Sequence, residues 1–283
     1  MDATHGPGIR FYKLQGSGND FVAIDNRALN IPPEAMPEVA VRLCKRAFGV
    51  GADVLFFLEE APAGSGAAYA WRFFNADGSR PAMCGNAARC AAKLACHLKI
   101  APARHVLLTE AGPIEAEVLP DGRQVKVQLT SPKDFTPNIA LATEGGSFEV
   151  HFVDTGVPHV VVFVQDLPTV DVATIGIAIR FNKRFAPAGT NVNFVQVKDA
   201  GSLLLRTYER GVEGETLACG TGAAAAQVVA RNLGLTGDEV EVTTSGGEKL
   251  RVSLDGDKLF LTGGAEMVFA GDLFPDAVGL ALA

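Results

Sequence analysis

Two cysteines, Cys84 and Cys219, have the residue type and the setting for acid/base chemistry. Each follows a loop that contains glycine and an acidic residue. Each also opens an Ala-rich segment, at residues 84–98 and 219–233, that predicts a buried helix. A thiol at a helix N-terminus lies beside unpaired backbone N–H groups, which lower cysteine pKa values from about 8.5 to roughly 3.5 to 7.5. The sequence therefore predicts that a thiolate is accessible near neutral pH.

The backbone N–H groups that follow each cysteine are suited to hold an anion. Gly85 and Asn86 supply them in one segment and Gly220 and Thr221 in the other, so the two helix ends predict a clamp for one carboxylate or phosphate. Thiols on opposite faces of such a substrate suit the removal of a proton on one face and the return of one on the other. The thiolate is then the general base and the thiol the general acid. The clamp stabilises the charge that develops on the carboxylate, and the reaction inverts a stereocentre.

The other motifs imply neither a cofactor nor a metal. The chain has no glycine fingerprint for a dinucleotide, no phosphate-loop motif and no setting typical of a pyridoxal lysine. Its five cysteines form no CxxC pair, which argues against a zinc ribbon, a disulfide framework and thiol redox chemistry. Cys44, Cys90 and Cys96 have no counterparts in the repeat described next, so we interpret them as residues of helix packing.

Four blocks of sequence recur in the same order, which predicts an internal duplication. Chance accounts for any one match, but not for four at nearly the same offset. The offsets lie between 134 and 138 residues, and the matched blocks are 18–22 with 156–160, 51–56 with 189–194, 72–88 with 206–224, and 109–127 with 243–261.

The duplication predicts two similar lobes. Residues 1–135 form an N-terminal lobe carrying Cys84 and residues 136–283 form a C-terminal lobe carrying Cys219, with the join in the Pro-, Thr- and Gly-rich stretch at 131–147. This division assigns the last strand to the second lobe. Whether the last strand packs on the N-terminal lobe is left open. A pseudo-two-fold arrangement places the two cysteines on opposite sides of a cleft, which is a usual ligand site.

Short segments rich in Val, Leu and Phe lie between the Gly and Pro residues and predict strands. The fold class is therefore α+β, with two pseudo-symmetric lobes of short strands around one Ala-rich helix each. We expect strands at residues 9–15, 20–25, 54–59, 70–75, 105–109, 148–153, 160–165, 192–198 and 203–209, and helices at 33–47, 84–98, 169–179 and 219–233.

Composition narrows the class of partner. The 283 residues are 48% hydrophobic and 20% charged, enough to bury a sizeable core, and the net charge is −7. There is no basic stripe with interleaved aromatic residues, so a nucleic-acid partner is not expected. The longest apolar stretches fall short of the roughly 18 residues of a membrane helix, and the first residues lack a signal-peptide pattern. We expect a cytoplasmic protein that binds a small molecule and no membrane.

Five motifs resemble those of diaminopimelate epimerases, and the resemblance covers about residues 9 to 271. It implies that each lobe is a mixed, mostly antiparallel strand barrel around a central helix. It also implies an isomerase, independent of pyridoxal phosphate, that interconverts LL- and meso-diaminopimelate in lysine and peptidoglycan precursor biosynthesis, commonly as a homodimer. The motifs are LQGSGNDFVAID at 14–25, FNADGS at 74–79, CGNAAR at 84–89, GVPH at 156–159 and YERGVEGETLACGTG at 208–222.

The resemblance also implies roles for individual residues. Cys84 and Cys219 match the acid/base pair, and His159 and Glu209 match positions that tune the thiols. Simpler interpretations are that His159 is a core histidine, that Asn19 and Asn75 are turn residues, and that Arg210 forms a surface ion pair. The positions that match substrate-binding residues are Asn19, Asn75, Gly85, Asn86, Asn191, Glu209, Arg210, Gly220 and Thr221.

Two departures bear on the substrate. Val157 stands where family members often have Asn, and Val54 stands where some have a polar side chain. A binding site with fewer polar contacts rejects a wrong substrate less strongly. The alternatives therefore include a racemase or isomerase of the same fold that acts on proline, hydroxyproline or histidine, and a phenazine-pathway isomerase. Another class of alternative is a two-lobed protein that binds an anion without chemistry.

Overall fold

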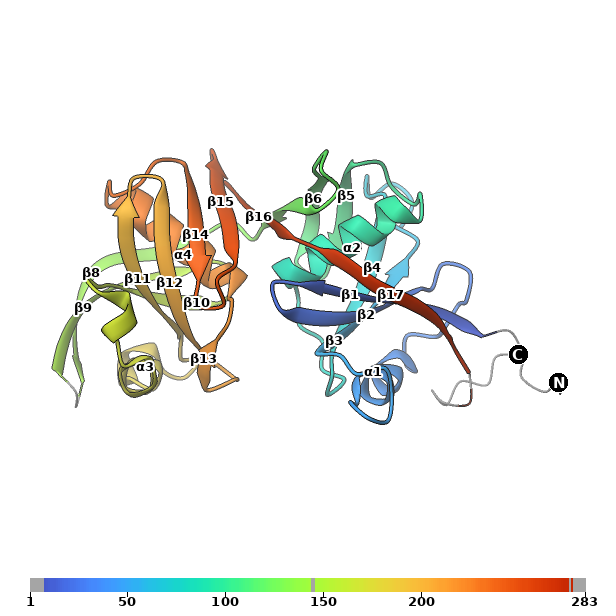
Figure 1. The fold of residues 1–283 in the computed structure, drawn as a ribbon, viewed down its shortest axis with the longest axis horizontal. Helices are drawn as coiled ribbons and strands as arrows, with labels where there is room; N and C mark the ends of the chain where they lie inside the picture. The colour runs from blue at the N-terminus through green and yellow to red at the C-terminus, as the bar shows by residue number, and fades with distance from the viewer. Residues whose placement is uncertain (1–7, 144–145, 275, 277–283) are drawn as a thin grey trace. The chain divides into compact units, whose positions relative to one another are not determined.

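The computed structural model describes residues 8–143, 146–274 and 276, and they form two compact units (Figure 1). The N-terminal unit contains the chain up to Val127 and again from Gly264 onward, and the second unit spans Gln128–Gly263. Within the described residues, no helix has the length and hydropathy needed to cross a membrane.

The strands of the N-terminal unit pair in the order β17, β1, β2, β3, β4, β5, β6, β7. All pairs are antiparallel except β2 with β3 and β4 with β5. In chain order the elements are β1 (Ile9–Gly16), β2 (Asn19–Asp25), α1 (Met36–Cys44), β3 (Val54–Glu59), β4 (Tyr69–Asn75), α2 (Gly85–His97), β5 (Arg104–Thr109), β6 (Gly112–Val118), β7 (Gln124–Leu129) and, last, β17 (Glu266–Leu273).

The second unit repeats this order as β8, β9, β10, β11, β12, β14, β15, β16, again with two parallel pairs at the matching places. The duplication seen in the sequence is therefore also present in the topology, which confirms the predicted fold class. The elements are β8 (Lys133–Thr143), β9 (Gly146–Asp154), β10 (Pro158–Phe163), a 3-10 turn (Leu167–Thr169), α3 (Val172–Arg180), a second 3-10 turn (Lys183–Phe185), β11 (Asn191–Asp199), β12 (Ser202–Glu209), β13 (Gly214–Thr216), α4 (Gly220–Asn232), β14 (Glu239–Thr244), β15 (Lys249–Asp255) and β16 (Lys258–Gly264).

The Ala-rich helices α2 and α4 are the central helices of their units. Helix α2 contacts β1, β2, β6 and β17, and α4 contacts strands from β9 to β15. Because these strands come from distant places in each pairing order, each sheet curves around its helix. Each of the two helices carries five alanines, whose small side chains let the strands approach closely.

The outer helices α1 and α3 cover the other face of each sheet. Met36 and Leu43 of α1 pack with Phe57 and Phe74 in one apolar cluster, while the α3 cluster contains Tyr208. A Cβ on Gly176 of α3 would lie 2.7 Å from the Tyr208 side chain, so this glycine permits the close approach of α3 to β12.

One feature of chain organisation differs from the prediction, and one that the prediction left open is given by the structure. Most of residues 131–147, predicted as a join, forms β8, which pairs with β9 and contains the expected division at 135 and 136. Its side chains are mostly exposed, and Asp134 and Asn138 have positive φ. Both features are also typical of a linker, so the sequence of this strand resembles that of a join between lobes. The final strand β17 pairs with β1, from Ile9 opposite Leu273 onward, and completes the N-terminal unit.

Candidate functional site

Cys84 and Cys219 each occupy the N-cap position of a central helix, as the sequence predicts. Both have extended backbone, with φ of −143° and −125°. Each carbonyl accepts the first helical hydrogen bond, from Ala88 and Ala223 respectively, at 2.9 Å. The backbone N–H groups of the next residues, which have no partner within a helix, therefore lie directly beside each thiol.

Of the other three cysteines, Cys44 and Cys90 are buried and Cys96 is partly buried. Burial raises the pKa of Cys44 and of Cys90 to about 12, and burial also raises the pKa of Cys96. A thiol with a raised pKa stays protonated near neutral pH. This agrees with the interpretation of these residues as parts of the helix packing.

In the N-terminal unit, a chain of side-chain hydrogen bonds joins Asn19 to the start of α2. Asn19 follows the β1–β2 turn, in which Ser17 and Gly18 have φ of 60° and 78°. Its Nδ2 donates to the Asp53 carboxylate at 2.7 Å, and its Oδ1 accepts from Asn86 Nδ2 at 3.3 Å. Because a carboxylate only accepts, Asp53 fixes which way the Asn19 amide points.

Asp53, to which the sequence analysis gave no role, therefore orients a predicted substrate-binding amide. We expect Asp53→Ala to raise KM about tenfold with a smaller change in kcat, since one orienting hydrogen bond contributes roughly 1 to 1.5 kcal/mol. Steady-state kinetics check this. Arg46→Ala is the matched control, because it removes the ion pair with Asp53 but leaves the bond to Asn19. An unchanged KM in Asp53→Ala would exclude the orienting role.

Asn75 has the contacts of a turn residue. Its backbone N–H donates to the Ser79 carbonyl and its Nδ2 to the Ser79 hydroxyl, both at 2.9 Å. The Ser79 hydroxyl donates in turn to Asp77 at 2.6 Å. These bonds hold the loop between β4 and α2, which leads to Cys84.

Arg89 is a buried cation on α2 that the sequence analysis quoted without a role. It is 0% exposed. Its Nε donates to the Gly264 carbonyl at 3.2 Å and its guanidinium also bonds the Ser17 hydroxyl. It thereby ties the central helix to the β1–β2 turn that precedes Asn19. The available signal was a single arginine in the first two turns of an Ala-rich helix that the sequence predicts to be buried, where unpaired charge is rare.

In the second unit, Asn191 links two predicted site segments. Its Oδ1 accepts the backbone N–H of Arg210 at 2.8 Å, and its Nδ2 donates to the Pro158 carbonyl at 3.3 Å. His159 lies opposite Asn191 in the parallel β10–β11 register. The Arg210 guanidinium donates to the Ala188 carbonyl at 2.8 Å.

The titratable groups of this half-site are shifted by burial. His159 is fully buried, and burial, followed by the charge of Arg210, lowers its pKa to about 3, so its ring is neutral near neutral pH. Burial raises the pKa of Glu209 above its ordinary value. Thr221 lies at the helix start, with its hydroxyl 3.6 Å from the Cys219 sulfur and its carbonyl accepting from Thr155 at 3.0 Å.

Asn193 and Gly222 complete the half-site and were missed by the sequence analysis. Asn193 Nδ2 lies 3.0 Å from His159 Nδ1. A Cβ on Gly222 would overlap Asn193 Oδ1 and lie 3.2 Å from the Cys219 sulfur. Of the predicted residues of this unit, His159 and Thr221 thus lie near the N-terminus of α4, while Asn191 joins Arg210 to the Pro158 carbonyl.

Of the two valines that depart from the family pattern, one begins a strand and the other directly precedes one. Val54 begins β3 and is 6% exposed. Val157 is partly buried, and its carbonyl accepts the Thr155 N–H at 3.2 Å.

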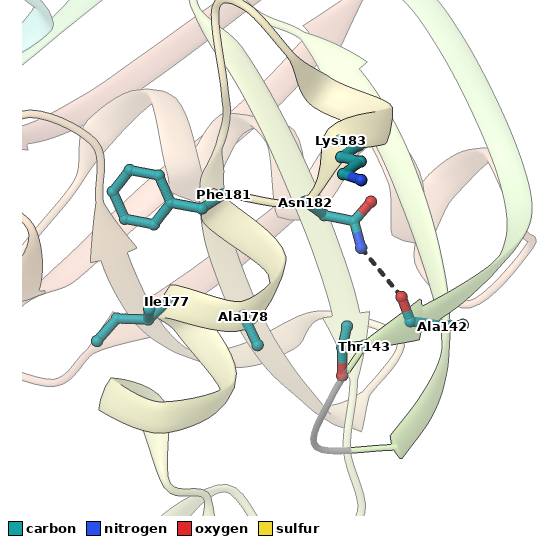
Figure 2. Close-up of a pocket in the computed structure, with 7 residues that line it drawn as sticks. All are labelled: Ala142, Thr143, Ile177, Ala178, Phe181, Asn182 and Lys183. Atoms are coloured by element: carbon teal, nitrogen blue, oxygen red, sulfur yellow. Dashed lines mark hydrogen bonds between the residues drawn. The ribbon is translucent and has the colours of Figure 1, made fainter.

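A cavity of about 640 Å³ lies elsewhere in the second unit (Figure 2). The Asn182 amide donates to the Ala142 carbonyl across it at 3.0 Å. None of the predicted site residues lines it; the lining consists of Ala142, Thr143, Ile177, Ala178, Phe181, Asn182 and Lys183. Among the described residues, no three His, Cys, Asp or Glu side chains gather as a metal ion requires.

Solved structures share this fold at low sequence identity. A hydroxyproline epimerase from Agrobacterium vitis has a TM-score of 0.71 at 17% identity, covering 100% of this chain and 97% of its own. A PhzF-family phenazine biosynthesis protein from Bacillus anthracis has a TM-score of 0.70 at 16% identity, covering 94% and 98%. The chain thus shares its fold with these two proteins.

Sequence comparison gives the family within that fold. The family model for diaminopimelate epimerase matches residues 11–134 and 151–268. Curated diaminopimelate epimerases are 48% identical in Hydrogenobaculum sp., over 92% of this chain and 97% of the relative, and 43% identical in Aquifex aeolicus, over 94% and 98%. The chain belongs to the diaminopimelate epimerase family, which confirms the resemblance found in the sequence.

Proposed function

We propose that the chain is an isomerase that interconverts LL- and meso-diaminopimelate without a cofactor, by a two-base thiol/thiolate mechanism. The observation that carries the proposal is the matched placement of Cys84 and Cys219 as N-caps of the two central helices. Relatives named diaminopimelate epimerase at 43% and 48% identity support the choice of substrate over other amino acids.

This mechanism requires one of the two thiols on each face of a single substrate carbon. One cysteine, as thiolate, takes the proton from the α-carbon, and the electron pair of the broken C–H bond delocalises onto the adjacent carboxylate. The other cysteine, as thiol, gives its proton to the opposite face. The reaction ends with the two sulfur atoms in exchanged protonation states, so the reverse reaction uses them in exchanged roles.

The carboxylate next to the reacting carbon is bound by backbone N–H groups at both helix starts, those of Gly85 and Asn86 and those of Gly220 and Thr221. Donors already aimed at the oxygens where charge develops lower the barrier without reorganising. The positive ends of the two helix dipoles act in the same direction.

The remaining residues bind the distal end of the substrate or tune the thiols. Arg210 is suited to the distal carboxylate because its planar guanidinium pairs with a carboxylate through two parallel hydrogen bonds. The amides of Asn19, Asn75 and Asn191 and the Glu209 carboxyl complete the distal contacts. His159 and Glu209 adjust the protonation of the cysteines, which fits their burial.

The cellular setting forms part of the same proposal. The reaction supplies lysine and peptidoglycan precursors and takes place in the cytoplasm, where a reducing environment prevents the two cysteines from forming a disulfide. The active form is a homodimer. Val268 and Phe269 on β17, the first strand in the pairing order of its unit, are 57% and 50% exposed, and they offer an apolar edge to a second copy of the chain.

Solvent exchange tests the reaction. We expect incubation with LL-diaminopimelate in heavy water to place about one deuterium on the α-carbon of each product molecule, because the protonating thiol carries a solvent-derived proton. Mass spectrometry of substrate and product at early times measures this. Absence of deuterium would leave only anion binding. Faster turnover of proline, hydroxyproline or histidine than of diaminopimelate would refute the substrate.

A further inference from the structure

Asn193 forms a buried network with His159 and Thr207. All three residues are at most 2% exposed. Asn193 Nδ2 donates to the Val160 carbonyl at 2.9 Å and lies 3.0 Å from His159 Nδ1, while Asn193 Oδ1 accepts from the Thr207 hydroxyl at 3.0 Å. The side-chain amide therefore uses both of its hydrogens and its oxygen.

The partners of Asn193 determine where the histidine proton lies. A backbone carbonyl only accepts, so the atom facing Val160 is the amide nitrogen, and its second hydrogen points at His159 Nδ1. Nδ1 must then present a lone pair. Burial lowers the pKa of His159 to about 3, so the ring is neutral and its single N–H is at Nε2.

The Nε2 atom of His159 is buried and has no hydrogen-bond partner in the part of the chain that the structure describes. An N–H donor in this position is poised for an acceptor that the protein alone does not supply. The network also touches the helix that carries the thiol, because Asn193 Oδ1 occupies the space where a Cβ of Gly222 would lie, in the first turn of α4.

We propose that Asn193, held by Thr207, is a positioning residue that locks His159 in the Nε2–H tautomer, so that the ring donates a hydrogen bond to negative charge in the active site and does not act as a base. The inference rests on the proposed function for the charge that the ring meets, but the tautomer follows from the network alone. In this proposal His159 is not one of the groups that move a proton.

Nuclear magnetic resonance reads the tautomer directly. In protein labelled with ¹⁵N-histidine, long-range proton–nitrogen correlations distinguish a protonated from an unprotonated ring nitrogen, and His159→Gln identifies the signals among the five histidines. We expect unprotonated Nδ1 and protonated Nε2 in the wild-type protein. A protonated Nδ1 overturns the lock, whatever the activity.

Asn193→Asp tests the consequence for catalysis. A carboxylate of nearly the same shape only accepts, so it draws the ring proton to Nδ1 and reverses the tautomer. We expect kcat to fall at least about tenfold with KM little changed. Thr207→Ser keeps the hydroxyl and is expected to remain within about twofold of wild type, whereas Thr207→Val loses part of the activity.

The outcomes separate this inference from the proposed function. A reversed tautomer with unchanged kcat in Asn193→Asp refutes the donor role of His159. A locked tautomer in a protein that does not exchange the α-proton of diaminopimelate refutes the proposed function but leaves the lock intact.

Discussion

Cys84→Ser and Cys219→Ser are each expected to lower epimerisation by about 10²- to 10⁴-fold, which is the usual contribution of a positioned general acid or base. A serine hydroxyl has nearly the size of the thiol, but it does not ionise near neutral pH. Each variant therefore retains a group that can occupy the N-cap position and loses the group that forms a thiolate. Conversion of LL- to meso-diaminopimelate, followed by chiral chromatography, measures the loss.

Cys96→Ser is the matched control, because Cys96 lies on the same helix as Cys84 and its sulfur contacts the Pro102 carbonyl at 3.2 Å. Activity close to wild type is expected for this variant. Circular dichroism of all three variants separates lost chemistry from lost folding. Full activity in either Cys84→Ser or Cys219→Ser would refute the two-base scheme.

Much of the fold was predictable because its signals are local. The high alanine content of residues 85–97 and 220–232 marks a helix packed among strands, and the predicted ranges match α2 and α4 closely. The matched glycines Gly51 and Gly189 both have left-handed φ, 77° and 65°, so the repeat preserved backbone geometry as well as sequence. The placement of both cysteines at helix starts followed from the same signals.

The ranges expected for strands omit several strands of the structure, namely β6, β7, β8, β13, β14, β15, β16 and β17. Two of these, β8 and β17, depend on long-range pairing, and residues 133–143 were interpreted as a join. Strand β8 is stabilised only where β9 pairs with it, and β17 by its pairing with β1, some 250 residues earlier in the sequence. Exposed edge strands lack the alternating apolar pattern by which a strand is recognised.

The missed site residues share a different cause. Asp53 directly precedes β3 and Asn193 lies within β11, and the local sequence marks neither as a site residue. Their roles come from the side chains that they meet on the neighbouring strands. In the repeat, Asp53 aligns with Asn191. The side chain of each accepts a hydrogen bond within its own unit, Asp53 from the Asn19 amide and Asn191 from the Arg210 backbone N–H. A comparison of the two halves at single positions would have indicated Asp53.

Gly222→Ala is expected to lower kcat about 10²-fold and to reduce thermal stability. Alanine is the better helix former by about 1 kcal/mol, so local propensity favours the substitution. Packing opposes it, because the new Cβ would overlap Asn193 Oδ1 and lie 3.2 Å from the Cys219 sulfur. Overpacking of this kind costs about 1 to 3 kcal/mol, which lowers Tm by several degrees. The new Cβ is expected to displace the Cys219 thiol by about 1 Å, and a displacement of that size accounts for the expected loss of kcat.

The repeat supplies an internal argument for this prediction. The residue that matches Gly222 in the N-terminal unit is Ala87, which is fully buried at the same place in α2. The helix itself therefore accepts a methyl group there, and the requirement for glycine comes from Asn193, whose counterpart is Leu55.

A double-mutant cycle with Asn193→Ala, followed by thermal melting, measures this coupling. Removing the Asn193 side chain opens the space that the new methyl group needs, so Gly222→Ala should cost little further stability in that background. Gly237→Ala, where a Cβ would meet no atom within 4 Å, is the control for the substitution itself. Equal losses of Tm in the two backgrounds would show that Asn193 is not what excludes a side chain at position 222.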